Sequence, residues 1–328
     1  MKWNKTEKKQ LKIFALTAFG LPILMGIVMG FSYFQGNDVT AFPNAQMYYP
    51  AAGVMLALIF TKGKEEKLPK KFFTGFLITT AIMIVTAFVS VAAPRLNWMM
   101  LGQYPIIIFS IVCLILLLIE KKETRAFYGL KFTGKKGAKS WLYVLLFFVL
   151  YLVRFLLSCV IEGQLPMFVD IFTEPSTYLM ILILVINFVF SFTAFFGEEY
   201  GWRFFFQPLL QKRFGLKGGV VVLGVLWGLW HLPINIFYYS PDTWIISVVL
   251  QLITCVSFAI FFGYGYMKTE NIWVPVIMHY INNNMIAVLT GSADLGNQIY
   301  RWVDIPIAIV INLVFLVFIF SRAFKEKK

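Results

Sequence analysis

The hydrophobic positions of this chain are grouped into about ten long apolar runs, separated by shorter polar segments. Runs of about 20 residues recur along the whole sequence, and a helix of that length crosses a hydrocarbon core about 30 Å thick. The pattern therefore predicts an all-α, polytopic bundle of about ten transmembrane helices. The apolar runs cover residues 11–34, 45–60, 72–92, 104–119, 140–161, 177–198, 218–237, 244–267, 272–290 and 304–321.

The composition agrees with a membrane protein and excludes a soluble monomer. Of the 328 residues, 59% are hydrophobic and only 14% are charged, whereas about a quarter of the residues in ordinary soluble domains are charged. The first apolar run is long and has no small-residue cleavage site, so we expect a retained helix rather than a signal peptide.

The net charge of +13 is distributed unevenly between successive loops. If the ten runs all cross the membrane, 26 of the 29 Lys and Arg residues lie on one side, Arg95 and Arg301 on the other, and Arg154 within a helix. The positive-inside rule then places both termini in the cytoplasm of a multi-pass cell-membrane protein. It also places loops 61–71 and 120–139 inside, and 35–50, 162–176 and 238–243 outside. The basic residues indicate topology and contact with anionic lipid, not a nucleic-acid partner.

The basic loop 120–139 is also the best candidate for a domain boundary. It divides the chain into an N-terminal part, residues 1–139, and a C-terminal helical bundle, residues 140–328. All three cysteines lie far apart in apolar runs and show no C-x-x-C spacing, so we expect them to be small buried hydrophobic residues. They are Cys113, Cys159 and Cys255.

Ionisable groups at membrane depth are costly and are often functional. The first such cluster is Glu198-Glu199-Tyr-Gly-Trp-Arg203, at the end of an apolar run. Glu199 and Arg203 are four residues apart, so on a helix they share a face and can pair. Glu198 points about 100° away and lacks that partner, which makes it a candidate proton acceptor or donor. The alternative is a polar group that only caps the cytoplasmic end of a helix.

The chain has two histidines, and both lie within apolar runs. His231, in the segment from Trp227 to Pro233, is predicted near the middle of the membrane, and Pro233 is expected to kink the helix beside it. His279 precedes Asn283 by four residues, so the two share a helix face and are suited to stabilising an oxyanion. The alternatives are a satisfied core histidine and polar contacts between transmembrane helices.

Together the clusters supply a carboxylate, two histidines and an amide, which is sufficient for hydrolysis by an activated water. Ser191 and Ser257 lack a Gly-x-Ser-x-Gly setting, and no H-E-x-x-H is present. Glu198, His231 and His279 form a candidate set of zinc ligands. The residues leave a mechanism with a divalent metal such as zinc and a metal-free mechanism equally open.

The order E-E-x-x-x-R, aromatic-x-x-x-His and His-x-x-x-Asn, each on its own membrane helix, resembles the CPBP family. That family includes the type II CAAX prenyl endopeptidases and bacteriocin self-immunity proteins. The resemblance covers about residues 177–290, and its second motif departs from the family's common pattern because Trp227 stands where Phe is usual.

The resemblance implies an intramembrane endopeptidase, often classed as a metalloprotease, with an active site open toward the cytoplasm. It implies that Glu198 and His231 activate the attacking water, and that His279 and Asn283 stabilise the oxyanion. Glu199 and Arg203 would brace the first motif. The expected substrate is a membrane-associated peptide or protein, in CAAX-type processing or in bacterial peptide maturation or immunity.

Two other classes of function remain open from the residues alone. A catalytically idle membrane scaffold or immunity protein would keep the motifs without turnover. A secondary transporter also places ionisable residues at mid-membrane, but it should show two corresponding halves. No second copy of the 198–283 cluster is present, which favours the enzyme.

Overall fold

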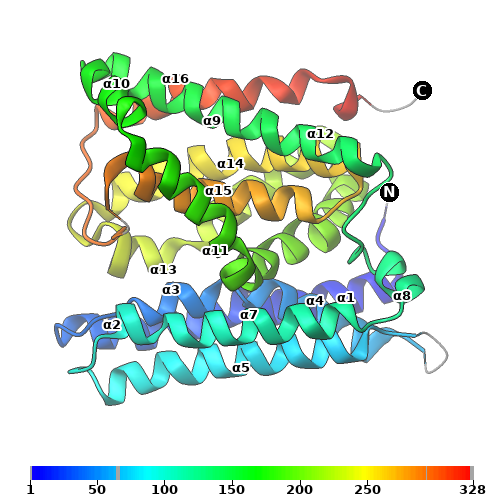
Figure 1. Ribbon diagram of the computed structural model, residues 1–328. Helices are drawn as coiled ribbons and strands as arrows, with labels where there is room; N and C mark the ends of the chain where they lie inside the picture. The colour runs from blue at the N-terminus through cyan, green and yellow to red at the C-terminus, as the bar shows by residue number, and fades with distance from the viewer. Residues whose placement is uncertain (1, 64–66, 293, 326–328) are drawn as a thin grey trace.

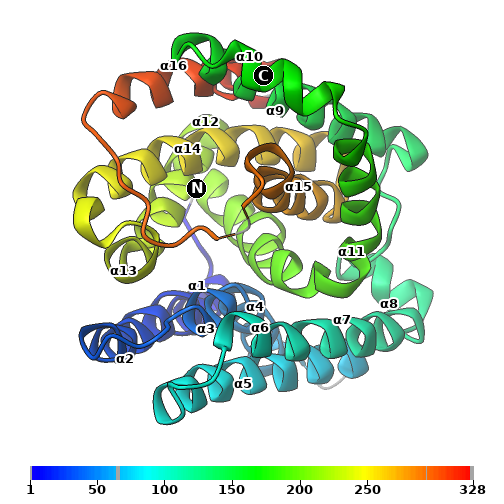
Figure 2. The same cartoon turned by 60° about the vertical axis from the view of Figure 1, so that its left-hand side comes forward.

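The computed structural model describes residues 2–63, 67–292 and 294–325, and within these ranges the chain forms helices and no strand. The helices are arranged in two layers, one from the N-terminal third of the chain and one from the rest (Figures 1 and 2). The predicted all-α class is therefore confirmed. The order of elements follows the predicted apolar runs.

The first helix of the N-terminal layer begins earlier in the sequence than the first apolar run. The first helix begins at Lys5 because Asn4 and Glu7 form a capping box, in which each side chain accepts a bond from the other residue's backbone N–H. A π-helical segment then joins it to the next helix without a break. The elements are α1 (Lys5–Ala15), η1 (Leu16–Gly20), α2 (Leu21–Phe34), α3 (Ala41–Gln46), α4 (Tyr49–Thr61), α5 (Lys70–Ala92), α6 (Trp98–Leu101) and α7 (Gln103–Leu118).

A short helix, α8 (Lys122–Phe127), leads to the second layer. In this layer α12 is not one straight helix, because Gly215 has φ 77° and ψ 168° and the chain turns there. The elements are α9 (Trp141–Ile161), α10 (Leu165–Thr173), α11 (Pro175–Glu199), η3 (Tyr200–Phe206), α12 (Gln207–Trp230), α13 (Leu232–Ile234), η4 (Asn235–Tyr239), α14 (Trp244–Thr269), α15 (Trp273–Thr290) and α16 (Asp304–Leu316).

Six helical stretches among the described residues are long and apolar enough to cross a membrane. The count is lower than ten for physical reasons. Helices α4 and α16 have 13 residues each, and α15 carries His279 and three asparagines. The 65-residue stretch Pro175–Tyr239 counts once, although at about 1.5 Å per residue it is roughly three times the thickness of a bilayer core. The expected ten spans therefore stay a prediction.

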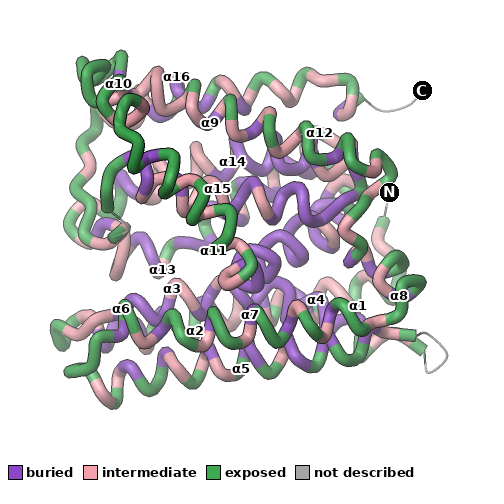
Figure 3. Tube along the Cα trace, in the orientation of Figure 1, coloured by how far each residue is buried: buried purple, intermediate pink, exposed green. Residues whose placement is uncertain are grey.

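The outer surface of the bundle is apolar, as a bilayer requires. Large side chains such as Phe34 and Ile27 are 79% and 67% exposed, and helices α5, α9 and α11 carry many more. Figure 3 shows many exposed residues on these helices, whereas the residues of α14 and α15 are mainly buried or intermediate. This surface is opposite to that of a soluble protein, so the chain is a multi-pass membrane protein.

The basic segments meet at one end of the bundle. Lys212 pairs with Glu7 at 2.7 Å, and Lys135 pairs with Glu270 at 2.5 Å. Lys62 lies 5.6 Å from the ring of Phe127. These contacts join the N-terminus, loop 61–71, loop 120–139 and the turns near 212 and 270. We call this the basic end, and both chain termini lie there in Figure 1, as an even number of crossings requires.

The opposite end gathers the segments that are poor in Lys and Arg. The backbone N–H groups of Asn297 and Gln298 donate to the carbonyls of Tyr238 and Tyr239, and the Tyr300 N–H donates to Thr243 Oγ1. We call it the neutral end because few Lys and Arg residues lie there, although the acidic Asp38 and Asp294 do. The cytoplasmic orientation of the basic end stays a prediction, and Lys64, Lys327 and Lys328 lie outside the described residues.

The loop count misplaces one basic residue. It assigns Arg203 to the cytoplasmic segment 199–217, but the Arg203 side chain is fully buried and bonded to Glu199. The continuous helix from α11 through η3 carries it into the bundle. The difference in the number of Lys and Arg residues between the two ends is large. Removing Arg203 from the count therefore does not change the predicted orientation.

Two glycines let the layers approach each other at the predicted site. A Cβ on Gly197 would lie 2.4 Å from the Met47 carbonyl oxygen, and a Cβ on Gly201 would lie 2.2 Å from Pro50 Cβ. The two glycines are four residues apart, so they form one small-residue face against the start of α4. This face brings the N-terminal layer into contact with Glu198 and its neighbours.

We expect Gly201→Ala to lower the free energy of unfolding by about 1–3 kcal/mol or more, because the added methyl group overpacks a backbone contact. Gly20→Ala is the matched control, since Gly20 is also helical but has nothing within 4 Å of its Cβ position. Melting of both variants in the same detergent measures the difference. Equal melting temperatures would show that the contact between the layers accommodates the added methyl group at no cost in stability.

Candidate active site

The candidate site lies where α11 continues into the π-helical segment η3. Glu198 and Glu199 are the last residues of α11, and both side chains are buried, with 2% and 0% of each residue exposed. A π-helical turn is uncommon and is frequently found at functional sites. Each glutamate bonds to the residue four positions later: Glu198 to Trp202 and Glu199 to Arg203.

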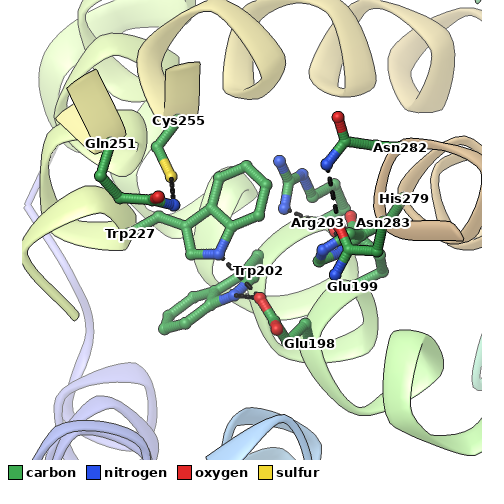
Figure 4. Close-up of polar contacts among 10 residues, drawn as sticks. All are labelled: Glu198, Glu199, Trp202, Arg203, Trp227, Gln251, Cys255, His279, Asn282 and Asn283. Carbon is green, nitrogen blue, oxygen red and sulfur yellow. Dashed lines mark hydrogen bonds and ion pairs between the residues drawn. The ribbon is translucent and has the colours of Figure 1, made fainter. Parts of the chain in front are cut away.

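Glu198 is held by two indole groups. Its Oε2 accepts hydrogen bonds from Trp227 Nε1 at 2.8 Å and from Trp202 Nε1 at 3.3 Å (Figure 4). Its Oε1 has no hydrogen bond to a described residue, and the side chain lines a cavity. One oxygen therefore anchors the carboxylate, and the other is available to a water molecule or substrate. The sequence predicted correctly that Glu198 does not pair with Arg203.

Trp227 is the position at which the sequence departs from the family's common Phe. The structure gives this difference a chemical consequence, because phenylalanine has no N–H to donate to Glu198. We expect Trp227→Phe to lower kcat/KM by about 10- to 100-fold, since a hydrogen bond to a charged group contributes about 1.5–3 kcal/mol.

Trp273→Phe is the matched control for this prediction. Its indole donates to the Leu130 carbonyl at 3.4 Å and does not reach Glu198. Turnover of both purified variants, measured per folded molecule, tests the role of the bond. A loss of activity that is equal in the two variants would assign Trp227 to packing alone.

Glu199, Arg203 and His279 form a buried network beside Glu198. Glu199 Oε1 accepts from Arg203 Nη1 at 3.0 Å and from His279 Nδ1 at 2.8 Å. The Arg203 guanidinium also lies 4.3 Å from the ring of Trp227. The three residues are 0–4% exposed. This network joins α11, η3 and α15, so it fixes the positions of the elements that carry the site.

His231 lies at the interruption predicted from Pro233. Helix α12 ends at Trp230, His231 has φ −83° and ψ 2°, and the short helix α13 begins at Leu232. The Nδ1 atom of His231 is 2.8 Å from the Trp227 carbonyl oxygen. A carbonyl can only accept, so Nδ1 carries the proton and Nε2 of the neutral ring keeps its lone pair. His231 also lines the cavity.

Asn283 presents an amide donor to the same cavity. Its Oδ1 accepts a hydrogen bond from Asn282 Nδ2 at 2.8 Å, which orients the side chain (Figure 4). Its Nδ2 makes no hydrogen bond to another described residue, and Asn283 is part of the cavity wall. His279 lies one helical turn earlier, where its Nδ1 bonds to Glu199 and its side chain is not part of that wall.

The cavity has a volume of about 450 Å³ and brings together Glu198, His231 and Asn283. The N-terminal layer supplies a large part of its wall, which sequence reasoning missed. The side-chain Nδ2 of Asn44 is buried there with no hydrogen-bond partner in the described structure. The N-terminal residues that line the cavity are Thr40, Pro43, Asn44, Met47, Met99, Gln103 and Ile106.

No sequence signal identified Asn44, because a single asparagine beside Pro43 is typical of a turn or loop. One hydrophobic core runs through both layers, from Phe14 to Phe315. The predicted boundary at residues 120–139 stays a prediction, since a shared core does not decide where a domain begins.

The three zinc candidates are not arranged as a metal site. In the described part of the chain no group of three or more His, Cys, Asp or Glu side chains is placed to hold a metal ion. His279 Nδ1 bonds to Glu199 rather than facing Glu198, and Glu198 Oε2 is occupied by two indoles. We therefore derive no step through a metal.

The serine and cysteine residues that the sequence analysis did not favour as nucleophiles have no catalytic partner among the described residues. Ser191 is part of the cavity wall, but its hydroxyl donates to the Asn187 carbonyl four residues earlier. Cys113, Cys159 and Cys255 are free and buried, as predicted. The chemistry of the cavity is thus that of a carboxylate, an imidazole and amides.

The lining of the cavity extends from the site toward one end of the bundle. It extends from Glu198 to Thr40, Met99, Tyr238 and Leu295, which belong to the neutral end. The cytoplasmic access that the resemblance implied therefore stays a prediction.

Residues 175–285 match the model of one protein family, described as Type II CAAX prenyl endopeptidase Rce1-like. The match covers about a third of the chain and includes all six candidate residues, from Glu198 to Asn283. The match supports the family that the three motifs resemble, over this part of the chain. No curated protein and no solved structure matches the chain.

Proposed function

We propose that this chain, with its Rce1-like CAAX endopeptidase domain at residues 175–285, is an intramembrane endopeptidase that hydrolyses membrane-associated peptides or proteins. The observation that carries the proposal is the composition of the cavity wall. It combines a carboxylate oxygen of Glu198, the unprotonated Nε2 of His231 and the amide Nδ2 of Asn283.

Glu198 and His231 hold the attacking water. Both present acceptor atoms to one cavity, so a water molecule there can donate one hydrogen bond to Oε1 and the other to Nε2. Such a water has its oxygen lone pairs directed away from the two acceptors and toward a bound peptide. Positioning of this kind lowers the barrier because the reactants no longer need to be ordered.

The reaction then proceeds by general base and general acid catalysis. As the water oxygen forms a bond to the scissile carbonyl carbon, its proton passes to Glu198. The carbonyl oxygen becomes an oxyanion. Collapse of this intermediate breaks the C–N bond, and the proton held by Glu198 passes to the leaving amine. The products are a carboxylic acid and an amine, so atoms and charges balance without a covalent enzyme intermediate.

Asn283 stabilises the oxyanion through its Nδ2. Donors that are fixed before the reaction stabilise developing charge most effectively, and Asn282 fixes this amide. Glu199, Arg203 and His279 act as positioning residues, since their network holds α15 against η3. A direct contribution of His279 to the oxyanion would require its Nε2, because its Nδ1 is bonded to Glu199.

The substrate class follows the proposed family: a CAAX-type precursor, or a bacterial peptide processed in maturation or immunity. Comparative peptidomics of membranes with the wild-type chain and with Glu198→Ala tests the activity without naming the substrate beforehand. We expect an uncleaved precursor to accumulate in the variant and its fragments to disappear. Identical peptide profiles, with both proteins folded and equally abundant, would favour a catalytically idle scaffold.

A further inference from the structure

The cavity around Glu198 extends from the site toward only one end of the bundle. The residues that line it on each motif helix show this. On α11 the wall is formed by Ser191, Ala194, Phe195 and Glu198, all at or before the catalytic carboxylate. Since α11 begins beside α10 and ends at Glu199, these residues lie between the site and the neutral end. The wall includes no α11 or η3 residue beyond Glu198.

The other two motif helices give the same result. From His231 the wall continues through Ile234 to Tyr238 and Tyr239, whose carbonyls bond to the 297–298 backbone. On α15 it continues from Asn283 to Asn284, and Leu295 beyond the helix completes it. The lining therefore runs from the site to the neutral end on every motif helix.

A second hollow extends the cavity at the same end. It has a volume of about 310 Å³ and shares Thr40, Met99 and Tyr238 with the cavity. Its remaining wall comes from Phe237 and from residues of the segments 33–39 and 294–297, among them the acidic Asp38 and Asp294. Because they share these three residues, the two hollows adjoin each other between Glu198 and the neutral end.

The opposite side of the site is closed by aromatic side chains. Phe196, Tyr200 and Trp273 are 0–2% exposed and stack on one another, with ring centroids 4.9–5.6 Å apart. This aromatic layer is bonded to the basic loop: Tyr200 Oη donates to the Tyr128 carbonyl at 3.0 Å, and Trp273 Nε1 donates to the Leu130 carbonyl. A substrate at the basic end would have to displace this layer to reach Glu198.

We propose that the substrate reaches Glu198 from the neutral end, which the charge distribution places outside the cytoplasm. This inference rests on the proposed function in treating the bound molecule as a substrate. The side from which the cavity is reached does not depend on that function. The occupant is an extended polypeptide segment that is already at the extracytoplasmic face, such as a membrane-anchored precursor or the remnant of an exported one. At the entrance it would contact uncharged side chains such as Met99 and Tyr238 and the carboxylates of Asp38 and Asp294.

Single-cysteine labelling in intact cells tests the direction of access. In a background in which Cys113, Cys159 and Cys255 are replaced by Ala, Met99→Cys introduces a thiol into the cavity mouth, where Met99 is 48% exposed. Phe127→Cys introduces one at the basic end, where Phe127 is 70% exposed. We expect a membrane-impermeant maleimide added outside to label Met99→Cys, and to label Phe127→Cys only after permeabilisation.

Measuring proteolysis after labelling distinguishes the entrance of the cavity, at Met99, from other exposed positions at the neutral end. Ser292→Cys is the matched control, because Ser292 is exposed at the same end but does not line the cavity. Outside labelling should reduce the proteolysis of Met99→Cys at least tenfold relative to the same variant unlabelled, and should leave Ser292→Cys within about twofold. Labelling of Phe127→Cys from outside, with Met99→Cys reached only from inside, would overturn the proposed direction.

The two proposals fail in different ways. If Glu198→Gln abolishes proteolysis but the mouth is labelled only from the cytoplasm, the enzyme stands and the direction of access is wrong. If labelling follows the expected pattern but no cleavage depends on Glu198, the direction stands and the proposed hydrolysis is wrong. Labelling of both Met99→Cys and Phe127→Cys from the same side would contradict the two-ended arrangement itself.

Discussion

Glu198→Gln is expected to reduce peptide hydrolysis by about 10²- to 10⁴-fold while the protein stays folded. The amide has nearly the same shape, and its oxygen can still accept from Trp202 and Trp227. Its nitrogen would replace the Oε1 that faces the cavity. The variant therefore loses the acceptor for the water's proton but keeps its anchoring. His231→Ala is expected to give a similar loss, because Nε2 is the second acceptor for that water.

The adjacent carboxylate provides the control for this variant. Glu199→Gln breaks a fully buried ion pair and leaves the Arg203 guanidinium without its countercharge, which typically costs about 3–5 kcal/mol. We thus expect a lower melting temperature for Glu199→Gln and an unchanged one for Glu198→Gln. Turnover per folded molecule and melting in the same detergent measure both. Turnover of Glu198→Gln within about threefold of wild type would remove Glu198 from the role of general base.

Helix periodicity alone is enough to separate the two glutamates. The i,i+4 relation pairs Glu199 with Arg203 and leaves Glu198 facing elsewhere, and the structure has this arrangement. Periodicity does not supply the partners of Glu198, because Trp227 is 29 positions away in the sequence. Local spacing predicts contacts within a helix, whereas contacts between helices depend on how the bundle packs.

The apolar runs predicted the helices better than they predicted the membrane crossings. Every run is largely helical, including the first, whose helix begins earlier at a capping box. Apolar length alone does not report a kink such as that at Gly215, where two helices meet. Nor does it decide the depth of α15, whose His279 and asparagines reduce its apolar character.

The contribution of the N-terminal layer to the cavity was not predictable from its sequence. Residues such as Asn44 and Met47 carry no motif, and their place in the wall depends on the glycine face formed by Gly197 and Gly201. The side of the site toward which the cavity extends was not predictable from the sequence either, for a related reason. It depends on which side of the three motifs is filled by aromatic rings, and aromatic residues are so abundant along the chain that the sequence does not identify that side.

Asn283→Ala is expected to lower kcat by roughly 10²- to 10³-fold, about 3–4 kcal/mol, with substrate binding nearly unchanged. The reason is that Asn282 orients the Asn283 amide, so its Nδ2 is the donor presented to the cavity. Asn283→Asp should be worse than a neutral replacement, because its negative charge would face the developing oxyanion.

Asn282→Ala is the matched comparison, since it removes the orienting bond but keeps the Asn283 donor in the wall. Its loss of kcat should be smaller than that of Asn283→Ala, because a freely rotating amide still donates in part of its orientations. If Asn283 only holds helices together, the loss should instead be about 0.6–2 kcal/mol of stability, with full activity per folded molecule. Turnover and melting temperature measured on the same purified variants decide between these outcomes. A destabilised Asn283→Ala with wild-type specific activity would remove Asn283 from the catalytic set and leave the oxyanion to His279 Nε2 or to the unpartnered amide of Asn44.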